Sequence, residues 1–137
     1  MNFANLEAAV KFGREQERAA FESAIDANPL DSTNHLVYAD WLHENGEHDE
    51  ADFRRSMGEW HAKQSSGFNH PGSSYWVHRN DLPEGVNPLY FTVREFGYDP
   101  ADPSVSFRFG GGYQWPHYWG FEEAARRSFK AGLKNRD

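Results

Sequence analysis

The chain has 137 residues and no cysteine, which excludes disulfides, thiol catalysis and thiolate metal sites. Its net charge of −7 is concentrated in residues 1–60, where thirteen acidic and five basic side chains argue against a nucleic-acid backbone as partner. No apolar stretch reaches membrane-spanning length and no signal-peptide pattern opens the chain, so we expect a cytoplasmic protein without a membrane partner.

The first 63 residues predict an array of three to four helices. Apolar residues recur at helical spacing over about 3–12, 15–27, 32–44 and 48–63. Gly13 is expected to end or kink the first helix, which would bury Leu6 and Val10 on one side. Eleven Phe, six Tyr and five Trp offer enough ring area for a real core in spite of the modest aliphatic content.

The most distinctive motif of this half is Leu-Val-Tyr-Ala-Asp-Trp-Leu-His-Glu-Asn-Gly, residues 36–46, preceded by Asn-Pro-Leu-Asp and followed by Ala-Asp-Phe-Arg. On these residues, the segment from about 18 to 57 resembles the short repeat-companion domain that is expanded in planctomycete bacteria. The resemblance implies a bacterial protein with a helical scaffold and no assigned activity. Family members often carry the segment beside repeat domains, but no leucine-rich or propeller-type repeat follows here. The structural motif residues are Tyr38, Asp40, Trp41, Leu42, Gly46 and Phe53.

Beyond residue 63 the hydrophobic period changes from helical to alternating. Residues 64–74 are rich in Ser, Gly and Asn and predict a linker loop. Strands are expected over about 75–79, 89–96 and 104–109, joined as an antiparallel meander.

The chain then predicts a glycine bend, an aromatic connector and a last helix. The bend lies at residues 110–112, the connector at 113–119 and the helix at about 120–134. The expected fold is therefore α+β: a helical region (1–63), and a three-stranded antiparallel sheet with a C-terminal helix (75–137), packed as one compact unit.

No motif for catalysis, a metal or a cofactor is found. The acidic turn between His43 and His48 is interrupted by Asn45-Gly46, so a solvated turn is favoured over a weak divalent-ion site. His78, His117 and Glu95 could form an acid–base set only if folding brings them together. We therefore expect no enzyme, no catalytic residues, no cofactor and no resident metal.

A non-catalytic protein–protein interaction module of unknown pathway is the function that the sequence favours. The contact surface is expected in the aromatic connector and in any exposed part of the Trp41 and Trp60 rings. Two alternatives stay open: nucleotide or nucleic-acid binding through an arginine and aromatic sheet face, and an acidic inhibitor that binds a basic partner. The candidate binding residues are Arg79, Arg94, Arg108, Tyr113, Trp115, Tyr118 and Trp119.

Overall fold

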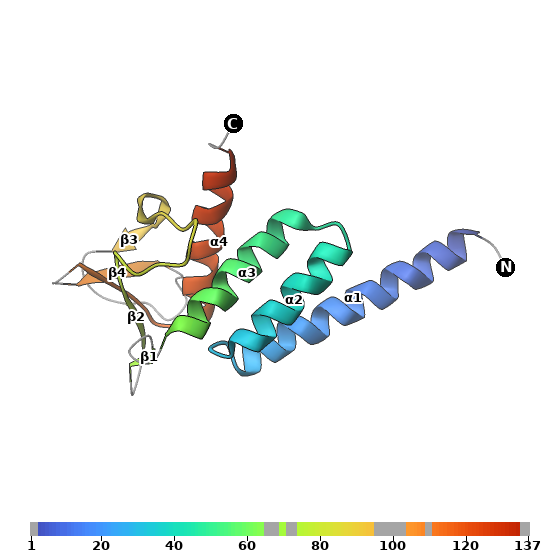
Figure 1. The fold of residues 1–137 in the computed structure, drawn as a ribbon, viewed down its shortest axis with the longest axis horizontal. Helices are drawn as coiled ribbons and strands as arrows, with labels where there is room; N and C mark the ends of the chain where they lie inside the picture. The colour runs from blue at the N-terminus through green and yellow to red at the C-terminus, as the bar shows by residue number, and fades with distance from the viewer. Residues whose placement is uncertain (1–2, 65–68, 71–73, 95–103, 109–110, 135–137) are drawn as a thin grey trace.

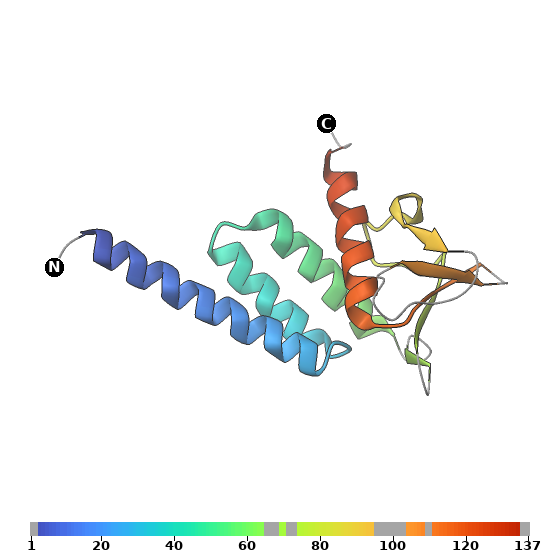
Figure 2. The same cartoon turned by 180° about the vertical axis from the view of Figure 1, so that it is seen from behind.

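The computed structural model describes residues 3–64, 69–70, 74–94, 104–108 and 111–134 (Figures 1 and 2). The molecule is elongated, with three helices at one end and a sheet at the other. The described helices are α1 (Phe3–Ala27), α2 (Ser32–Glu44), α3 (His48–Lys63) and α4 (Tyr118–Lys134), with a short 3₁₀ helix, η1 (Pro88–Tyr90). None of these helices is both long and apolar enough to cross a membrane.

Local capping chemistry defines the α2–α3 hairpin. The Asp31 carboxylate accepts a hydrogen bond from the Thr33 amide at 2.9 Å and so begins α2. At the other end, the Asn45 side chain donates to the Trp41 carbonyl at 2.8 Å, and Gly46 turns the chain with φ of 80°. The predicted helix–turn–helix is confirmed here.

The expected break at Gly13 is wrong. One helix of 25 residues, α1, runs through this position, and Gly13 is not among the described glycines with positive φ. A single glycine costs a helix only about 1 kcal/mol relative to alanine. Its neighbours over residues 4–20 are mostly Ala, Glu, Arg, Lys and Gln, which are strong helix formers that outweigh this cost.

The expected three-stranded antiparallel meander is also wrong. The described part holds a mixed sheet of five strands in the order β1-β2-β5-β4-β3, in which β3 runs parallel to β4. The bounds are β1 (Asn69–His70), β2 (Ser74–His78), β3 (Val93–Arg94), β4 (Val105–Arg108) and β5 (Gly112–Trp115). The predicted strands at 75–79 and 104–109 correspond to β2 and β4.

Two local features explain this difference. The Asn87 side chain accepts a hydrogen bond from the Leu89 amide at 3.0 Å and begins η1, so residues 89 and 90 form a 3₁₀ turn and the described part of the strand expected over 89–96 is reduced to β3. The first part of the aromatic connector instead forms β5, which lies between β2 and β4. Alternating Tyr113 and Trp115 place two rings on one face of this central strand.

A single core joins both halves of the molecule. Helix α4 lies between α3 and the sheet (Figure 1). Towards the sheet, Phe121 meets Trp115 with ring centroids 5.0 Å apart; towards α3, Phe129 meets Phe53 at 5.8 Å. Trp115, Phe121 and Phe53 have no exposed surface, so α4 connects the helical hairpin to the sheet.

Candidate functional site

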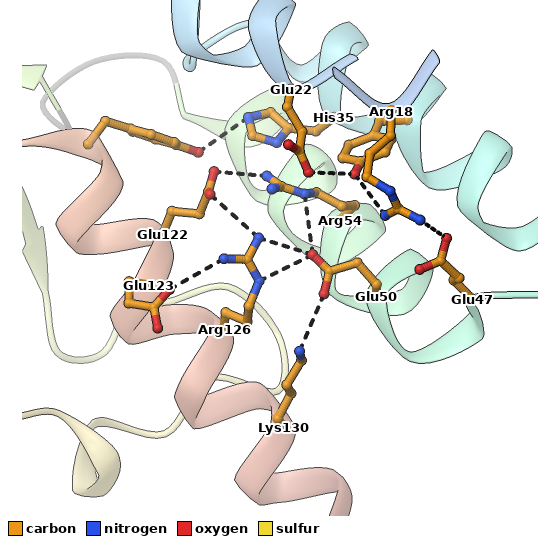
Figure 3. A network of polar contacts seen from close by, with 12 residues as sticks. Arg18, Glu22, His35, Glu47, Glu50, Arg54, Glu122, Glu123, Arg126 and Lys130 are labelled. Atoms are coloured by element: carbon orange, nitrogen blue, oxygen red, sulfur yellow. Dashed lines mark hydrogen bonds and ion pairs between the residues drawn. The ribbon is translucent and has the colours of Figure 1, made fainter. Parts of the chain in front are cut away.

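A buried arginine is the centre of the α3–α4 contact (Figure 3). Arg54 of α3 is only 2% exposed and donates to Glu122 Oε2 of α4 at 2.9 Å. Its Nε lies 3.9 Å from Glu50 Oε1 and makes no hydrogen bond with any described residue, while the guanidinium carbon lies 5.3 Å from the centre of the Tyr38 ring. A charge can be buried here because a carboxylate and an aromatic face replace water.

A second arginine extends this contact to the surface. Arg126 of α4 donates to Glu50 Oε1 at 3.0 Å and lies 3.5 Å from both Glu122 Oε1 and Glu123 Oε2, and Lys130 Nζ lies 3.7 Å from Glu50 Oε2 (Figure 3). Burial favours protonation of Glu122, but the Arg54 charge and hydrogen bond outweigh it and lower the pKa of this carboxyl. The network therefore fastens α4 to α3 with ionised groups.

Two histidines and a tyrosine lie beside this network and are equally buried. His35 of α2 and His61 of α3 stack with ring centroids 5.0 Å apart, and the Tyr118 hydroxyl of α4 lies 2.9 Å from His61 Nε2 and 3.2 Å from His35 Nε2. Burial lowers the pKa of His61 to about 3 and also lowers that of His35. Both rings are therefore neutral at pH 7.

The chemistry of this triad is that of a hydrogen-bonded core. His35, His61 and Tyr118 are 0%, 6% and 9% exposed, so a substrate could not meet them without opening the α2–α3–α4 junction. His35 Nε2 also lies 2.7 Å from the Pro29 carbonyl, and its Nδ1 is buried without a hydrogen-bond partner among the described residues. The arrangement supports a structural role.

One surface hollow adjoins the network. It has a volume of about 680 Å³ and lies where the start of α3 meets the end of α4. Three of its seven lining residues are acidic; the full lining is Gly46, Glu47, His48, Asp49, Glu50, Lys130 and Leu133. Across the described residues, no group of three or more His, Cys, Asp or Glu side chains is placed to hold a metal ion. His43 and His48 face each other across the turn, with their Nδ1 atoms 3.0 Å apart.

The second half of helix α1 packs against α2 and the α2–α3 turn. Trp41 Nε1 donates to the Glu17 carboxylate at 2.7 Å, the Tyr38 hydroxyl donates to Glu22, and Phe21 stacks on Tyr38 with centroids 5.3 Å apart. Arg18 forms an ion pair with Glu47 of the α2–α3 turn. All these attachments lie at or after Glu17, because α2 has 13 residues against the 25 of α1.

The first half of α1 extends beyond the hairpin as a bare helix (Figures 1 and 2). Leu6 and Val10 are each 48% exposed. Val10 precedes Phe21 by eleven residues, about three helical turns, so it continues the face that packs on α2. Within the described part, α1 contacts no helix or strand other than α2. This apolar face is the clearest candidate for a contact surface.

Most of the aromatic residues predicted to bind a partner are core residues instead. Tyr113, Trp115 and Tyr118 are buried, at 8%, 0% and 9% exposure. They come from β5 and the start of α4, where the sheet meets the helix. Trp119 alone of the four is exposed, at 48%, and its ring stacks on His117 with centroids 5.9 Å apart. Burial removes the other three rings from any external contact surface.

The structure describes the three arginines predicted to bind in different detail. Arg94 pairs with Ser106 in the sheet register, and Arg108 pairs with Gly112, but the Arg108 side chain lies outside the description. Arg79 is exposed and lies over Gly111, where an added Cβ would be 3.2 Å from its Nε. Of the suggested acid–base set, His78 accepts from the Asn80 amide, His117 stacks on Trp119, and Glu95 lies outside the described residues.

The motif residues serve the helical hairpin. Tyr38, Leu42 and Phe53 are buried, and Trp41 is partly buried against α1. Asp40 is exposed and lies 3.7 Å from Arg55 Nη2 of α3.

The sequence interpretation missed the free half of α1 and expected Leu6 and Val10 to be buried. The sequence signal for it is the length mismatch between a continuous α1 and α2, which the expected break at Gly13 conceals.

Comparison with known proteins finds no matching family model, curated protein or solved structure. The resemblance of residues 18–57 to the repeat-companion domain therefore stays a prediction.

Proposed function

We propose that this chain is a non-catalytic protein–protein interaction module whose contact element is the free first half of α1. The observation that carries the proposal is the exposure of Leu6 and Val10 on a helix segment that projects from the body. The best-placed acid–base groups, His35, His61 and Tyr118, are sealed in the core, which supports a role without catalysis.

The energetics of a bare helix support the same reading. An isolated helix of about 15 residues is marginal in water, because propagation barely outweighs the cost of nucleation. The second half of α1 is already held in a helix because Phe21 packs on Tyr38 of α2. The first half therefore needs only propagation, not nucleation, to extend it. A partner that covers Leu6 and Val10 would add the hydrophobic burial that the extension lacks.

The experiment is affinity capture with the tagged chain from cells that express it naturally. Leu6→Glu combined with Val10→Glu should lose the captured partner, because two charges then replace the apolar face. Phe12→Glu is the matched control: Phe12 is 61% exposed and lies away from that face, so the partner should be retained. Capture that is indifferent to the Leu6 and Val10 changes would contradict the proposal.

A second candidate, binding of a nucleotide or single-stranded nucleic acid, is favoured by one specific observation. The Trp76 indole lies over Gly112, where an added Cβ would meet its ring at 2.3 Å. Gln114 pairs with Trp76 in the register, and Ser106, the partner of Arg94, pairs with Gln114. Trp76 and Arg94 thus end one row of residues across the sheet, and a base stacked on the ring would direct its strand along this row towards the arginine.

This candidate is tested by fluorescence anisotropy with a labelled oligonucleotide at several salt concentrations. Binding that weakens with salt and is lost in Arg94→Ala/Arg108→Ala, but not in Lys63→Ala, would support it. No binding at low salt would exclude it.

A further inference from the structure

We infer that the partner of the free half of α1 is a second copy of this chain, paired with it as an antiparallel helix. This inference rests on the proposed function, because it names the occupant of the same surface. The face in question is formed by Leu6, Val10 and Gly13, spaced by four and three residues. Gly13 has no atom within 4 Å of an added Cβ, so a neighbouring backbone can approach closely at this point.

The charges beside this face are self-complementary. Glu7 and Arg14 are seven residues apart, about two turns, and so lie on the same flank of the apolar face. Both are exposed, and neither makes an ion pair with a described residue. The flank next to the apolar face thus presents one negative and one positive group, two turns apart, without an ion-pair partner among the described residues.

An antiparallel second copy satisfies both charges at once. When Glu7 lies level with Arg14 of the second copy, Val10 lies beside Val10 of the second copy, and Arg14 meets its Glu7 in return. Two-fold symmetry therefore gives two identical ion pairs around one apolar seam. A parallel pair would instead set Glu7 and Arg14 against the uncharged opposite flank, which carries Ala9 and Gln16.

The size of the seam predicts a weak dimer. The overlapping helices would bury much less than the ~800 Å² per partner of a standard interface. We therefore expect dimers only at high protein concentration, with rapid exchange between monomer and dimer.

The test is sedimentation equilibrium of the full chain from about 10 µM to about 1 mM. The wild type should show a concentration-dependent monomer–dimer equilibrium. Glu7→Arg and Arg14→Glu should each weaken it by about tenfold, because each places like charges at both pairs. Glu15→Arg, the same change of charge on the outer side of α1, should leave it unchanged. Far-UV circular dichroism checks that every variant keeps its helices.

The decisive samples combine the two changes. Glu7→Arg/Arg14→Glu in one chain should restore the dimer, because the pairs are exchanged. An equimolar mixture of the two single variants should form a heterodimer in preference to either homodimer. A wild type that stays monomeric at about 1 mM, or single variants that dimerise like it, would overturn the inference.

The experiments distinguish a failure of the dimer inference from a failure of the proposed function. If the chain is monomeric but a different protein is captured in a Leu6- and Val10-dependent manner, the second copy is excluded and the proposed function stands. If capture is also indifferent to Leu6 and Val10, the proposed function falls as well.

Discussion

Arg54 and its neighbour Arg55 differ in what surrounds them, although they are adjacent on α3. The Arg54 side chain is 3% exposed and lies 2.9 Å from Glu122 of α4. The Arg55 side chain is 39% exposed and lies 3.7 Å from the exposed carboxylates of Asp40 and Asp52. Arg54 therefore makes a buried pair with α4, whereas Arg55 makes only exposed pairs, with Asp40 of α2 and with Asp52 of its own helix.

Replacement of the two arginines should therefore have unequal effects. Arg54→Ala should lower the free energy of unfolding by about 3 kcal/mol, because Glu122 loses its buried hydrogen-bonded partner and keeps only Arg126 at 3.5 Å. Arg55→Ala should change it by less than about 0.5 kcal/mol, since exposed ion pairs contribute little. Urea unfolding of both variants measures the difference, and similar losses would show that the Arg54–Glu122 pair does not hold α4 to α3.

The buried histidines make stability depend on pH. The folded pKa of His61 is lowered to about 3, whereas an unfolded histidine titrates near 6.5, so the unfolded chain takes up the proton first. This contribution is complete above pH 6.5 and is lost as the pH falls towards 3. The lowered pKa of Glu122 adds a further loss only below its ordinary value of 4.5.

Unfolding between pH 7.5 and 5 isolates the histidine effect. His61 should account for about 2 kcal/mol of lost stability over this interval. In His61→Gln, which keeps a polar group near Tyr118, the decline should be smaller by about that amount. A decline as steep as in the wild type would contradict the assignment. Chemical denaturation at each pH supplies the values.

At the scale of elements, α1 is longer than its neighbour α2, so its two halves have different surroundings. Its second half packs on α2 through Phe21 and Tyr38, and its first half has water around Leu6 and Val10. The second half depends on tertiary contacts, while the first depends on helix propensity and on its fixed base. Gly13 lies between them, at the weakest position of the free segment.

Gly13→Ala should therefore strengthen the extension without disturbing the body. An alanine Cβ would meet no atom within 4 Å, so the change removes only backbone freedom. We expect higher helicity by far-UV circular dichroism at 25 °C, with the midpoint of global unfolding almost unchanged. Lower helicity would show that the helix is interrupted at this residue.

The elements that the sequence predicted correctly are those with strong local signals. Asp31 and Asn45-Gly46 mark the ends of α2 by side-chain and left-handed capping, which depend on neighbouring residues only. Strands β2 and β4 were found from alternation. The parallel β3–β4 pair and the central place of β5 depend on contacts between distant segments, which local patterns do not encode.

The candidate site was harder to predict than the fold. Tyr113, Trp115 and Tyr118 are predicted binding residues that lie in the core. Aromatic residues are common both in interfaces and in cores, and composition cannot separate the two. The pairing of Arg54 with Glu122 joins residues 68 positions apart and has no local signature. Exposure on α1 follows from the relative lengths of two helices, which a misplaced boundary at Gly13 concealed.

At the scale of the whole molecule, one continuous core carries a sheet at one end and a bare helix at the other (Figures 1 and 2). Helix α4 connects the hairpin to the sheet, through the Arg54 network on the side of α3 and through Phe121 and Trp115 on the side of the sheet. A rigid body with one projecting helix is a suitable geometry for holding a partner, or a second copy, at a fixed orientation.

Hydrogen exchange of the α1 amides tests this account most directly. At about 10 µM chain, where the weak dimer is dissociated, residues 5–16 should exchange quickly and residues 18–27 slowly, because only the second half is packed. At about 1 mM, the first half should become protected. Equal protection of both halves at the lower concentration would show that the chain itself covers Leu6 and Val10, and would contradict the account.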